Sequence, residues 1–194
     1  MKNEFIGLFE KSLIYAIEKH KGQYRKNSNF PYIWHPISVA KNVEENKKSK
    51  NLELLMTASL LHDLVEDVED VTLEEIAKLF GYKVAALVEE LTSDPIEIEK
   101  MGKTEYLKMK MGKMSSYALV IKLSDRLDNV KDLSSGSESF RTKYSKETLE
   151  ILMHLYDCGR KLTDTHIKIM NKIEVSLAAQ TKNEPYPTKP TVTI

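Results

Sequence analysis

The chain has 194 residues, which is enough for one domain with a sizeable buried core. Lysine plus arginine and aspartate plus glutamate are equal at 29 each, so no overall positive field favours nucleic acid or an anionic membrane as a partner. Cys158 is the single cysteine, which excludes an internal disulfide, and no N-terminal apolar stretch resembles a signal peptide or a membrane span. We therefore expect a cytoplasmic protein.

Apolar residues recur at helical spacing along almost the whole chain, and glycine (7) and proline (6) are few, which predicts an all-α fold with short loops. No internal repeat and no convincing strand run interrupts this pattern. The expected helices cover residues 4–21, a segment that begins near 36, and residues 52–65, 73–80, 83–91, 103–114, 118–127, 145–161 and 163–179. Residues 1–180 are expected to form one helical bundle, and residues 181–194, with three of the six prolines, a loosely ordered tail.

Local signals mark several helix ends. Thr72 and Glu75 form a capping-box pattern, which predicts a helix that begins after Thr72 and stops at Gly81. Residues 92–95 (TSDP) have the composition of a turn. Residues 134–137 (SSGS) are expected to form a mobile connection.

Residues 58–67 hold the most chemical information in the chain. They place His62 and Asp63 at the polar end of an apolar helix, followed by Glu66 and Asp67. An adjacent imidazole and carboxylate can bind one divalent cation, and the two following carboxylates can act on water, which indicates metal-assisted hydrolysis. A His-Asp dipeptide also arises by chance, and a histidine at the end of an apolar helix is commonly structural, so the prediction depends on further residues.

Two further residues complete a candidate ligand set. His35 lies where a proline-marked loop should end and a helix begin, with Pro36 at its first position. Asp125 lies in an apolar run, where an inward-facing carboxylate is costly unless a cation compensates its charge. The alternative for Asp125 is a salt bridge with Lys122 or Arg126 on an exposed face.

The candidate ligands are two imidazoles and two carboxylates. Such oxygen-rich, thiolate-free ligation suits manganese, iron or magnesium better than a structural zinc, with zinc an open alternative. Glu66, three positions after Asp63, can approach the same cleft in helical register and accept a proton from water. The alternative for Glu66 and Asp67 is a solvated acidic cluster that continues into Glu69 and Asp70.

Five ordered groups of residues extend the pattern beyond the His-Asp pair. They are residues 20–26 (HKGQYRK), 31–36 (PYIWHP), 60–67 (LLHDLVED), 80–81 with 87–92 (FG and LVEELT) and 121–129 (IKLSDRLDN). Their order and spacing resemble the hydrolase domain of Rel/SpoT-type alarmone enzymes, a branch of the HD superfamily, from about residue 10 to residue 150. Because no synthetase or regulatory domain fits in the remaining length, the chain most resembles a stand-alone small alarmone hydrolase, a group that includes the animal-type enzymes.

The resemblance implies an all-helical HD domain with one Mn²⁺ that removes the 3′-pyrophosphate of (p)ppGpp, yielding GDP or GTP. Carried over residue by residue, it implies the metal ligands His35, His62, Asp63 and Asp125. It implies that the attacking water is positioned and deprotonated by Glu66 and Asp67. It implies guanine contacts from Arg25 and Lys26 and a sugar contact from Asn129.

A polyanionic substrate requires local positive charge in a chain of zero net charge. Arg25 can stack its planar guanidinium on a purine and still pair with phosphate. Lys122 and Arg126, which lie beside Asp125, are further candidates for substrate contacts. Other candidates are Lys19, Lys21 and Lys26 near Arg25, and Lys100, Lys103, Lys108, Lys110 and Lys113 in or near the basic helix. The alternative for that helix is a solvated face.

Several other functions stay open. With the same chemistry, the substrate could be the adenosine alarmone pppApp or NADPH, or the protein could act as an antidote that destroys the product of a toxic small alarmone synthetase. A catalytically silent module that senses nucleotides is a different class of function, although the complete ligand set and the Glu66-Asp67 pair argue against it. The equal numbers of basic and acidic residues give no indication of a nucleic-acid partner. The oligomeric state and the cellular metal are also open.

Overall fold

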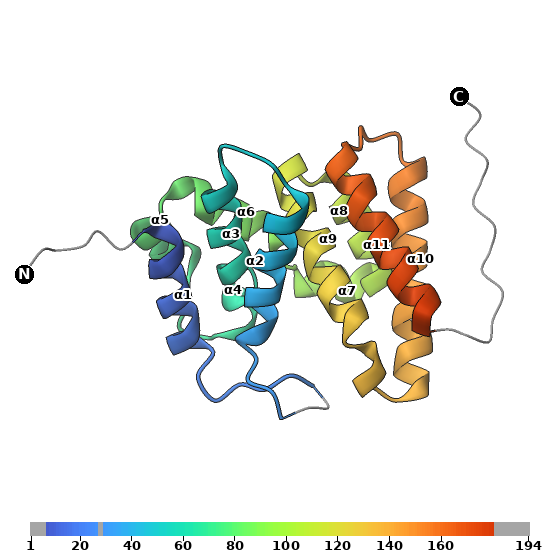
Figure 1. Cartoon of the computed structure of the whole chain (residues 1–194), viewed down its shortest axis with the longest axis horizontal. Coiled ribbons are helices and arrows are strands. Elements are labelled where there is room, and N and C mark those ends of the chain that lie inside the picture. The colour runs from blue at the N-terminus through green and yellow to red at the C-terminus, as the bar shows by residue number, and fades with distance from the viewer. Residues whose placement is uncertain (1–6, 27–28, 181–194) are drawn as a thin grey trace, which may run out of the picture.

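The computed structural model of the chain describes residues 7–26 and 29–180 (Figure 1). Within these ranges the fold is all-α, as predicted, and the only β feature is an isolated bridge between Tyr24 and Pro31. The helices are α1 (Leu8–Lys19), α2 (Trp34–Asn46), α3 (Leu52–Leu61), α4 (Leu64–Asp67), α5 (Leu73–Phe80), α6 (Tyr82–Leu91), α7 (Pro95–Met101), α8 (Lys103–Lys113), α9 (Ser116–Lys131), the 3-10 turn η1 (Leu133–Ser135), α10 (Glu138–Asp157) and α11 (Asp164–Gln180). None of these described helices is both long and apolar enough to span a membrane. The predicted tail lies outside the described residues, and the domain boundary at residue 180 stays a prediction.

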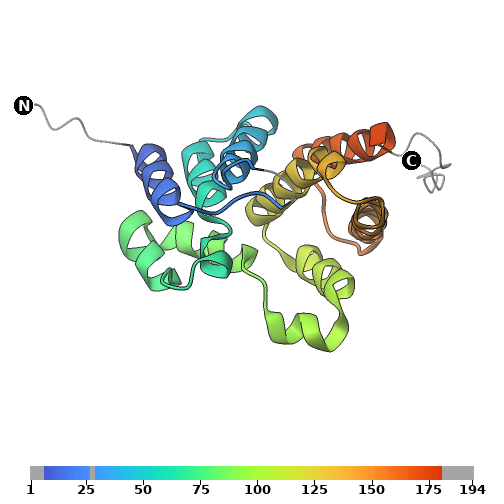
Figure 2. The same cartoon turned by 90° about the horizontal axis from the view of Figure 1, so that it is seen from below.

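α9 forms the centre of the fold. Most of its residues between Ala118 and Val130 are buried, which requires an apolar surface around most of its circumference. It packs against α2, α3, α6 and α11. Figure 2 shows α9 between the blue and teal helices of the N-terminal half and the orange and red helices α10 and α11. α3 packs in turn against α1, α2 and α6, so one core joins both halves of the chain.

The predicted helix over residues 52–65 is interrupted between α3 and α4. His62 Nδ1 lies 2.7 Å from the carbonyl oxygen of Ser59, and the amide of Asp67 donates to the carbonyl of Asp63 at 2.9 Å, which starts a new turn. The prediction of one continuous helix was therefore wrong. The break places His62 and Asp63 in a tight turn between two helices.

Other boundaries also differ from the prediction. α7 was not predicted, because none of its residues is buried and it lacks an apolar stripe. Asp94 caps α7 by accepting two backbone N–H bonds, at 2.9 and 3.2 Å. α10 begins at Glu138 rather than near residue 145, with Ser137 as its N-cap. The expected mobile connection at residues 134–137 overlaps the 3-10 turn η1.

Two helix signals in the sequence are confirmed. The amide of Glu75 donates to Thr72 Oγ1 at 3.2 Å, so Thr72 caps α5 as the capping-box pattern predicts. Gly81 ends α5 and precedes α6 with a φ of 92°, a backbone conformation that favours glycine. The chain can therefore reverse between α5 and α6 without an unfavourable side-chain clash.

Candidate active site

One cleft gathers nearly all the side chains that the sequence predicts for a site. It has a volume of about 640 Å³ and is lined by the loop before α2 and by residues of α2, α4, α8, α9 and α10. Every predicted site residue except His62 lines this cleft, and His62 is buried beside Asp63. The predicted residues in the lining are Arg25, Lys26, His35, Asp63, Glu66, Asp67, Lys122, Asp125, Arg126 and Asn129.

The four candidate metal ligands come from three separate parts of the chain. His35 is near the start of α2, His62 and Asp63 form the turn between α3 and α4, and Asp125 lies within α9. His35 Nε2 lies 3.5 Å from Asp63 Oδ2 and 3.2 Å from Asp125 Oδ1. His62 Nε2 lies 3.0 Å from Asp63 Oδ2 and 4.0 Å from Asp125 Oδ1. One donor atom each of His35, His62 and Asp63 lie within 4.8 Å of one another.

Both imidazole rings present Nε2 to this centre. His62 Nδ1 lies 2.7 Å from the Ser59 carbonyl, which can only accept, so Nδ1 bears the proton and Nε2 has the lone pair. His35 Nδ1 is held in the same way by Asp128 Oδ2, at 2.7 Å. His62 Nε2 is buried without a hydrogen-bond partner of good geometry, and the Asp63 carboxylate oxygen lies 3.0 Å away. His62 Nε2 and the Asp63 oxygen both offer lone pairs, so they attract each other only when they share a proton or a cation. The two residues therefore fit a metal ion between them.

The two carboxylates of the centre are held by neighbouring polar groups. The Tyr32 hydroxyl donates to Asp63 Oδ2 at 2.6 Å, and Asn129 Nδ2 donates to Asp125 Oδ1 at 2.6 Å. Lys122 Nζ lies 3.0 Å from Asp125 Oδ2. Asp125 is only 7% exposed, so its pairing with Lys122 is a buried contact and not a salt bridge on a solvated face.

The charges around this centre favour ionised carboxylates. Burial alone would raise the pKa of Asp125, but the positive charge of Lys122 holds that pKa well below its usual range. Burial alone would lower the pKa of Lys122, but the carboxylates of Asp125, Asp63 and Glu66 raise it. Asp125 is therefore an anion and Lys122 a cation at neutral pH. A carboxylate binds a metal in this ionised form.

Glu66 and Asp67 line the cleft beside the candidate ligands. Glu66 Oε1 accepts a hydrogen bond from the amide of Ser93 at 2.5 Å, which fixes one of its oxygens. Partial burial raises the pKa of Asp67, and the carboxylates of Asp63 and Glu66 raise it further. Asp70, by contrast, is absent from the lining, and its side chain is 74% exposed. The solvated-cluster interpretation therefore fits Asp70 better than Glu66 and Asp67.

The lysines of the basic segment differ in their surroundings. Lys103 lines the cleft. Lys100 and Lys108 pair at 2.7 Å with glutamates one turn away, and Lys110 donates to a backbone carbonyl. The solvated-face interpretation fits Lys100 and Lys108, whereas Lys103 adds positive charge to the cleft.

Arg126 lies in the cleft wall but is held by α10. Its NH1 lies 2.8 Å from Thr148 Oγ1, its NH2 lies 3.1 Å from Glu147 Oε1, and its guanidinium carbon lies 5.0 Å from the centroid of the Tyr144 ring. The residue is only 4% exposed. These contacts join α9 to α10, and the predicted contact of Arg126 with substrate stays a prediction.

Arg25 lies against the last turns of α9. Its Nε and NH2 atoms each lie 3.1 Å from Asp132 Oδ2, and NH2 lies 3.3 Å from Asp128 Oδ2. Its NH1 donates to Asn129 Oδ1 at 3.3 Å. The predicted pair Arg25 and Asn129 is therefore in direct contact, with Arg25 also bound to two carboxylates.

Three residues of this network were not predicted as site residues: Tyr32, Asp128 and Asp132. The sequence does contain a signal for two of them, since Asp128 and Asp132 follow Asp125 at three and seven positions and share its helix face. No pattern in the sequence pairs Tyr32 with Asp63, because that contact depends on how the loop before α2 packs onto the turn after α3.

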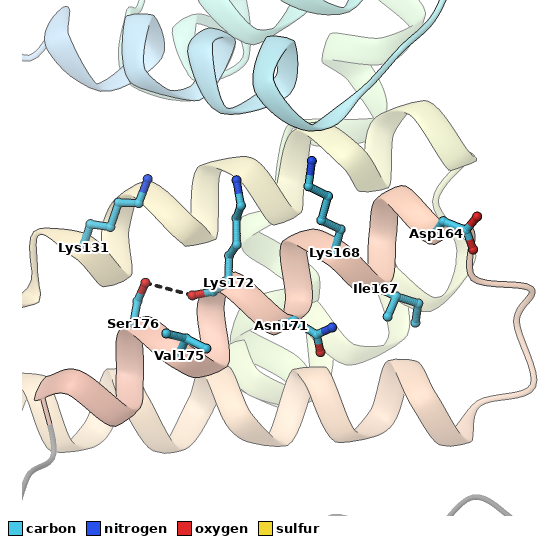
Figure 3. A pocket seen from close by; sticks show the side chains of 8 residues that line it. All are labelled: Lys131, Asp164, Ile167, Lys168, Asn171, Lys172, Val175 and Ser176. Atoms are coloured by element: carbon cyan, nitrogen blue, oxygen red, sulfur yellow. Dashed lines mark hydrogen bonds between the residues drawn. The ribbon is translucent and has the colours of Figure 1, made fainter.

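A second groove, of about 700 Å³, runs along α9 and α11 (Figure 3). Lys131, Lys168 and Lys172 point to the same side of it, and Lys131 and Lys168 bond to oxygen atoms of α2, the Asn42 side chain at 3.1 Å and the Glu45 carbonyl at 3.3 Å. Its lining contains a single carboxylate and no histidine. The hydrolytic chemistry therefore belongs to the cleft around Asp63 and not to this groove.

Comparison with known proteins agrees with this geometry. Residues 12–160 match the family model described as the HD domain. The chain belongs to the HD-domain family. Residues His35, His62, Asp63 and Asp125 all lie within the matched part of the HD domain.

Relatives of this HD domain include proteins named guanosine-3′,5′-bis(diphosphate) 3′-pyrophosphohydrolase. The MESH1 protein of Drosophila melanogaster is 40% identical over 140 residues, covering 72% of this chain and 76% of that protein. The MESH1 protein of Homo sapiens is 33% identical over 156 residues, covering 77% and 86%. The Aquifex aeolicus relative is 40% identical over 149 residues, which is 71% of this chain but only 19% of that longer protein.

A solved structure gives the same fold for the HD domain. It is a metazoan ortholog of SpoT, described as hydrolysing ppGpp and having a role in starvation responses. It matches with a TM-score of 0.75 and 31% sequence identity, over 90% of this chain and 96% of that one. The predicted all-α HD-domain bundle is therefore confirmed for the described residues.

Proposed function

We propose that this HD domain hydrolyses the 3′-pyrophosphate of (p)ppGpp, releasing pyrophosphate and GDP or GTP. The observation that carries the proposal is the meeting of two imidazole Nε2 atoms with two ionised carboxylates, beside Glu66 and Asp67, in one cleft. The names of the Drosophila, human and Aquifex relatives support this substrate. Mn²⁺ as the metal and the cytoplasm as the location belong to the same proposal.

In this proposal one divalent cation is held by His35, His62, Asp63 and Asp125. Two carboxylate oxygens and two imidazole nitrogens, without a thiolate, form a donor set that suits Mn²⁺. When bound, such a cation lowers the pKa of water and offsets negative charge on phosphoryl oxygens. The Ser59 carbonyl and the Asp128 carboxylate keep the two rings oriented for this task.

Glu66 and Asp67 orient and deprotonate the attacking water. Asp67 orients the water molecule and Glu66 accepts its proton. The water oxygen forms a bond to the phosphorus atom attached to the 3′ oxygen, and the bond between that phosphorus and the 3′ oxygen breaks. The 3′ oxygen keeps the electron pair and takes up a proton, so the products are pyrophosphate and a nucleotide with a free 3′-hydroxyl group.

The cleft supplies the contacts that a nucleotide needs. Lys122 and Lys103 place positive charge beside the reacting phosphates. Arg25 and Lys26 flank the guanine, and Asn129 contacts the sugar. To act on the phosphates, Arg126 has to leave its partners Glu147 and Thr148 on α10.

The test is a product analysis with purified protein and Mn²⁺, using ppGpp, pppApp and NADPH in separate reactions and the Asp63→Ala variant as the control. We expect pyrophosphate and GDP from ppGpp with the intact protein and neither product with the variant. If only pppApp or only NADPH is turned over, that compound would be the substrate instead of a guanosine alarmone. Binding of all three without turnover would support a nucleotide-sensing module instead.

A further inference from the structure

Among the residues that the structure describes, Asp128 is the one acidic side chain that contacts a candidate metal ligand from outside the metal centre. Its Oδ2 atom lies 2.7 Å from His35 Nδ1, and its side chain is only 15% exposed. The same oxygen lies 3.3 Å from Arg25 NH2. Asp128 is therefore held between a buried imidazole and a guanidinium, which fixes the direction of its carboxylate.

A carboxylate in this place controls the imidazole in two ways. It accepts a hydrogen bond from the protonated Nδ1 of His35. The lone pair of the ring therefore stays on Nε2, which faces Asp63 and Asp125. Its negative charge also makes the ring a stronger electron donor to a cation. His62 is oriented by the backbone carbonyl of Ser59, which no side-chain substitution removes. Of the two histidines, His35 is therefore the one whose orientation depends on another side chain.

Arg25 links this contact to the nucleotide side of the cleft. Its guanidinium bonds to Asp128, which holds His35, and to Asn129 Oδ1, while Asn129 Nδ2 donates to Asp125. Arg25 is thus connected to His35 through Asp128 and to Asp125 through Asn129. Asp132 binds the same guanidinium at 3.1 Å but forms no hydrogen bond or ion pair with His35 or Asp125.

We propose that Asp128 is a positioning residue that orients His35 for metal binding, an inference that rests on the metal-dependent function proposed above. The side chain touches neither the metal nor the reacting atoms. Its removal should weaken metal affinity in the absence of any nucleotide. Asp132 is a matched control, because it is the same residue type, lies on the same face of the chain after Asp125, and binds Arg25 but not His35.

The experiment is a calorimetric titration of the full chain with Mn²⁺ alone, for the wild type and the variants Asp128→Ala, Asp128→Asn and Asp132→Asn. We expect Asp128→Ala to weaken Mn²⁺ binding by about 10–100-fold, as found when such supporting partners are removed. Asp128→Asn should lose less Mn²⁺ affinity than Asp128→Ala. The amide oxygen of the asparagine still accepts a hydrogen bond from His35 Nδ1, although it has no negative charge. Asp132→Asn should bind within about twofold of the wild type, since it contacts no ligand.

Thermal unfolding without metal separates positioning from folding. Equal unfolding temperatures with weakened Mn²⁺ binding support the inference, and if Asp128→Ala does not fold, Asp128→Asn decides the question. Unchanged Mn²⁺ affinity in the folded Asp128 variants overturns it, as does an equal loss in Asp132→Asn. A wild type that binds Mn²⁺ but hydrolyses no alarmone would defeat the proposed function and leave this inference intact, because no substrate is present in the titration.

Discussion

At the residue scale, the neighbouring carboxylates of Asp63 and Glu66 have different surroundings and therefore suit different tasks. Asp63 is bound by the Tyr32 hydroxyl at 2.6 Å and faces both imidazoles, a position suited to a ligand. Glu66 has one oxygen on the amide of Ser93 and lines the cleft, a position suited to a base that acts on water. Three positions of sequence thus separate the proposed metal ligand from the proposed base.

The Glu66→Gln variant tests this separation. Glutamine keeps an oxygen that can accept from the Ser93 amide but cannot take a proton from water, so we expect kcat to fall about 10²–10⁴-fold. Mn²⁺ affinity should stay close to that of the wild type. Steady-state kinetics and a metal titration measure the two effects, and Asp70→Asn, an exposed acid outside the cleft, should keep activity within about twofold. Full turnover by Glu66→Gln would assign the base to another residue.

At the element scale, a buried ion pair joins α9 to α10. Arg126 of α9 binds Glu147 and Thr148 of α10, and none of these contacts involves the cleft interior. Removing one partner of a buried pair leaves an uncompensated charge, which is strongly destabilising. α10 also supplies Phe140 and Tyr144 to the cleft lining, so the pair indirectly shapes the cleft.

We expect Arg126→Ala to lower the free energy of unfolding by about 3–5 kcal/mol. Urea denaturation measures this loss, with Arg141→Ala, an exposed arginine on α10, as a control that should change stability by less than about 0.5 kcal/mol. A variant with unchanged stability and a raised KM would instead place Arg126 on the substrate, as expected from the need for positive charge near a polyanionic substrate.

The junction of α9 and α11 contains a buried histidine that makes stability depend on pH. His166 accepts from the amide of Thr163 through Nδ1 at 3.1 Å and donates to the Ser116 carbonyl through Nε2 at 2.9 Å, so the folded state holds it neutral. Burial lowers its pKa, and the charges of Arg160 and Lys47 lower it further. The unfolded chain takes up a proton at this residue near its ordinary value of about 6.5, before the folded chain does.

The contribution of His166 to the free energy of unfolding should therefore fall as pH drops below about 6.5, and above that value this contribution should not change with pH. Urea unfolding at pH 7.5 and 5.5 measures the slope. The His166→Gln variant should be less stable at pH 7.5 and show a smaller loss on acidification. His20 also has a lowered pKa, but it is present in both proteins, so the difference between their slopes reports His166. Identical slopes would contradict the assignment.

The elements that the sequence predicts well are those with a clear apolar face. The cap at Thr72 and the glycine at Gly81 are local signals, and the structure confirms both. α7 was missed because none of its side chains is fully buried. The break between α3 and α4 was missed because the apolar pattern continues through it, while the hydrogen bond from His62 to Ser59 that accompanies it leaves no periodic trace.

At the scale of the whole molecule, the candidate metal centre exists only because three helical segments meet. α9 packs against both α2 and α3, which brings Asp125 to His35 and to the turn of His62 and Asp63. The sequence could predict these residues by type and motif. It could not predict Asp128 or Asp132 as partners of His35 and Arg25, since those contacts span about 100 positions and depend on tertiary packing.

The proposed reaction requires that water attack the phosphorus next to the 3′ oxygen. The most direct measurement is hydrolysis of ppGpp in ¹⁸O-labelled water with Mn²⁺, followed by ³¹P NMR and mass spectrometry of both products. We predict one ¹⁸O atom in the released pyrophosphate and none in GDP, with no reaction after chelation of the metal and recovery when Mn²⁺ is restored. Label in the nucleotide, release of single phosphates, or turnover that survives chelation would contradict it.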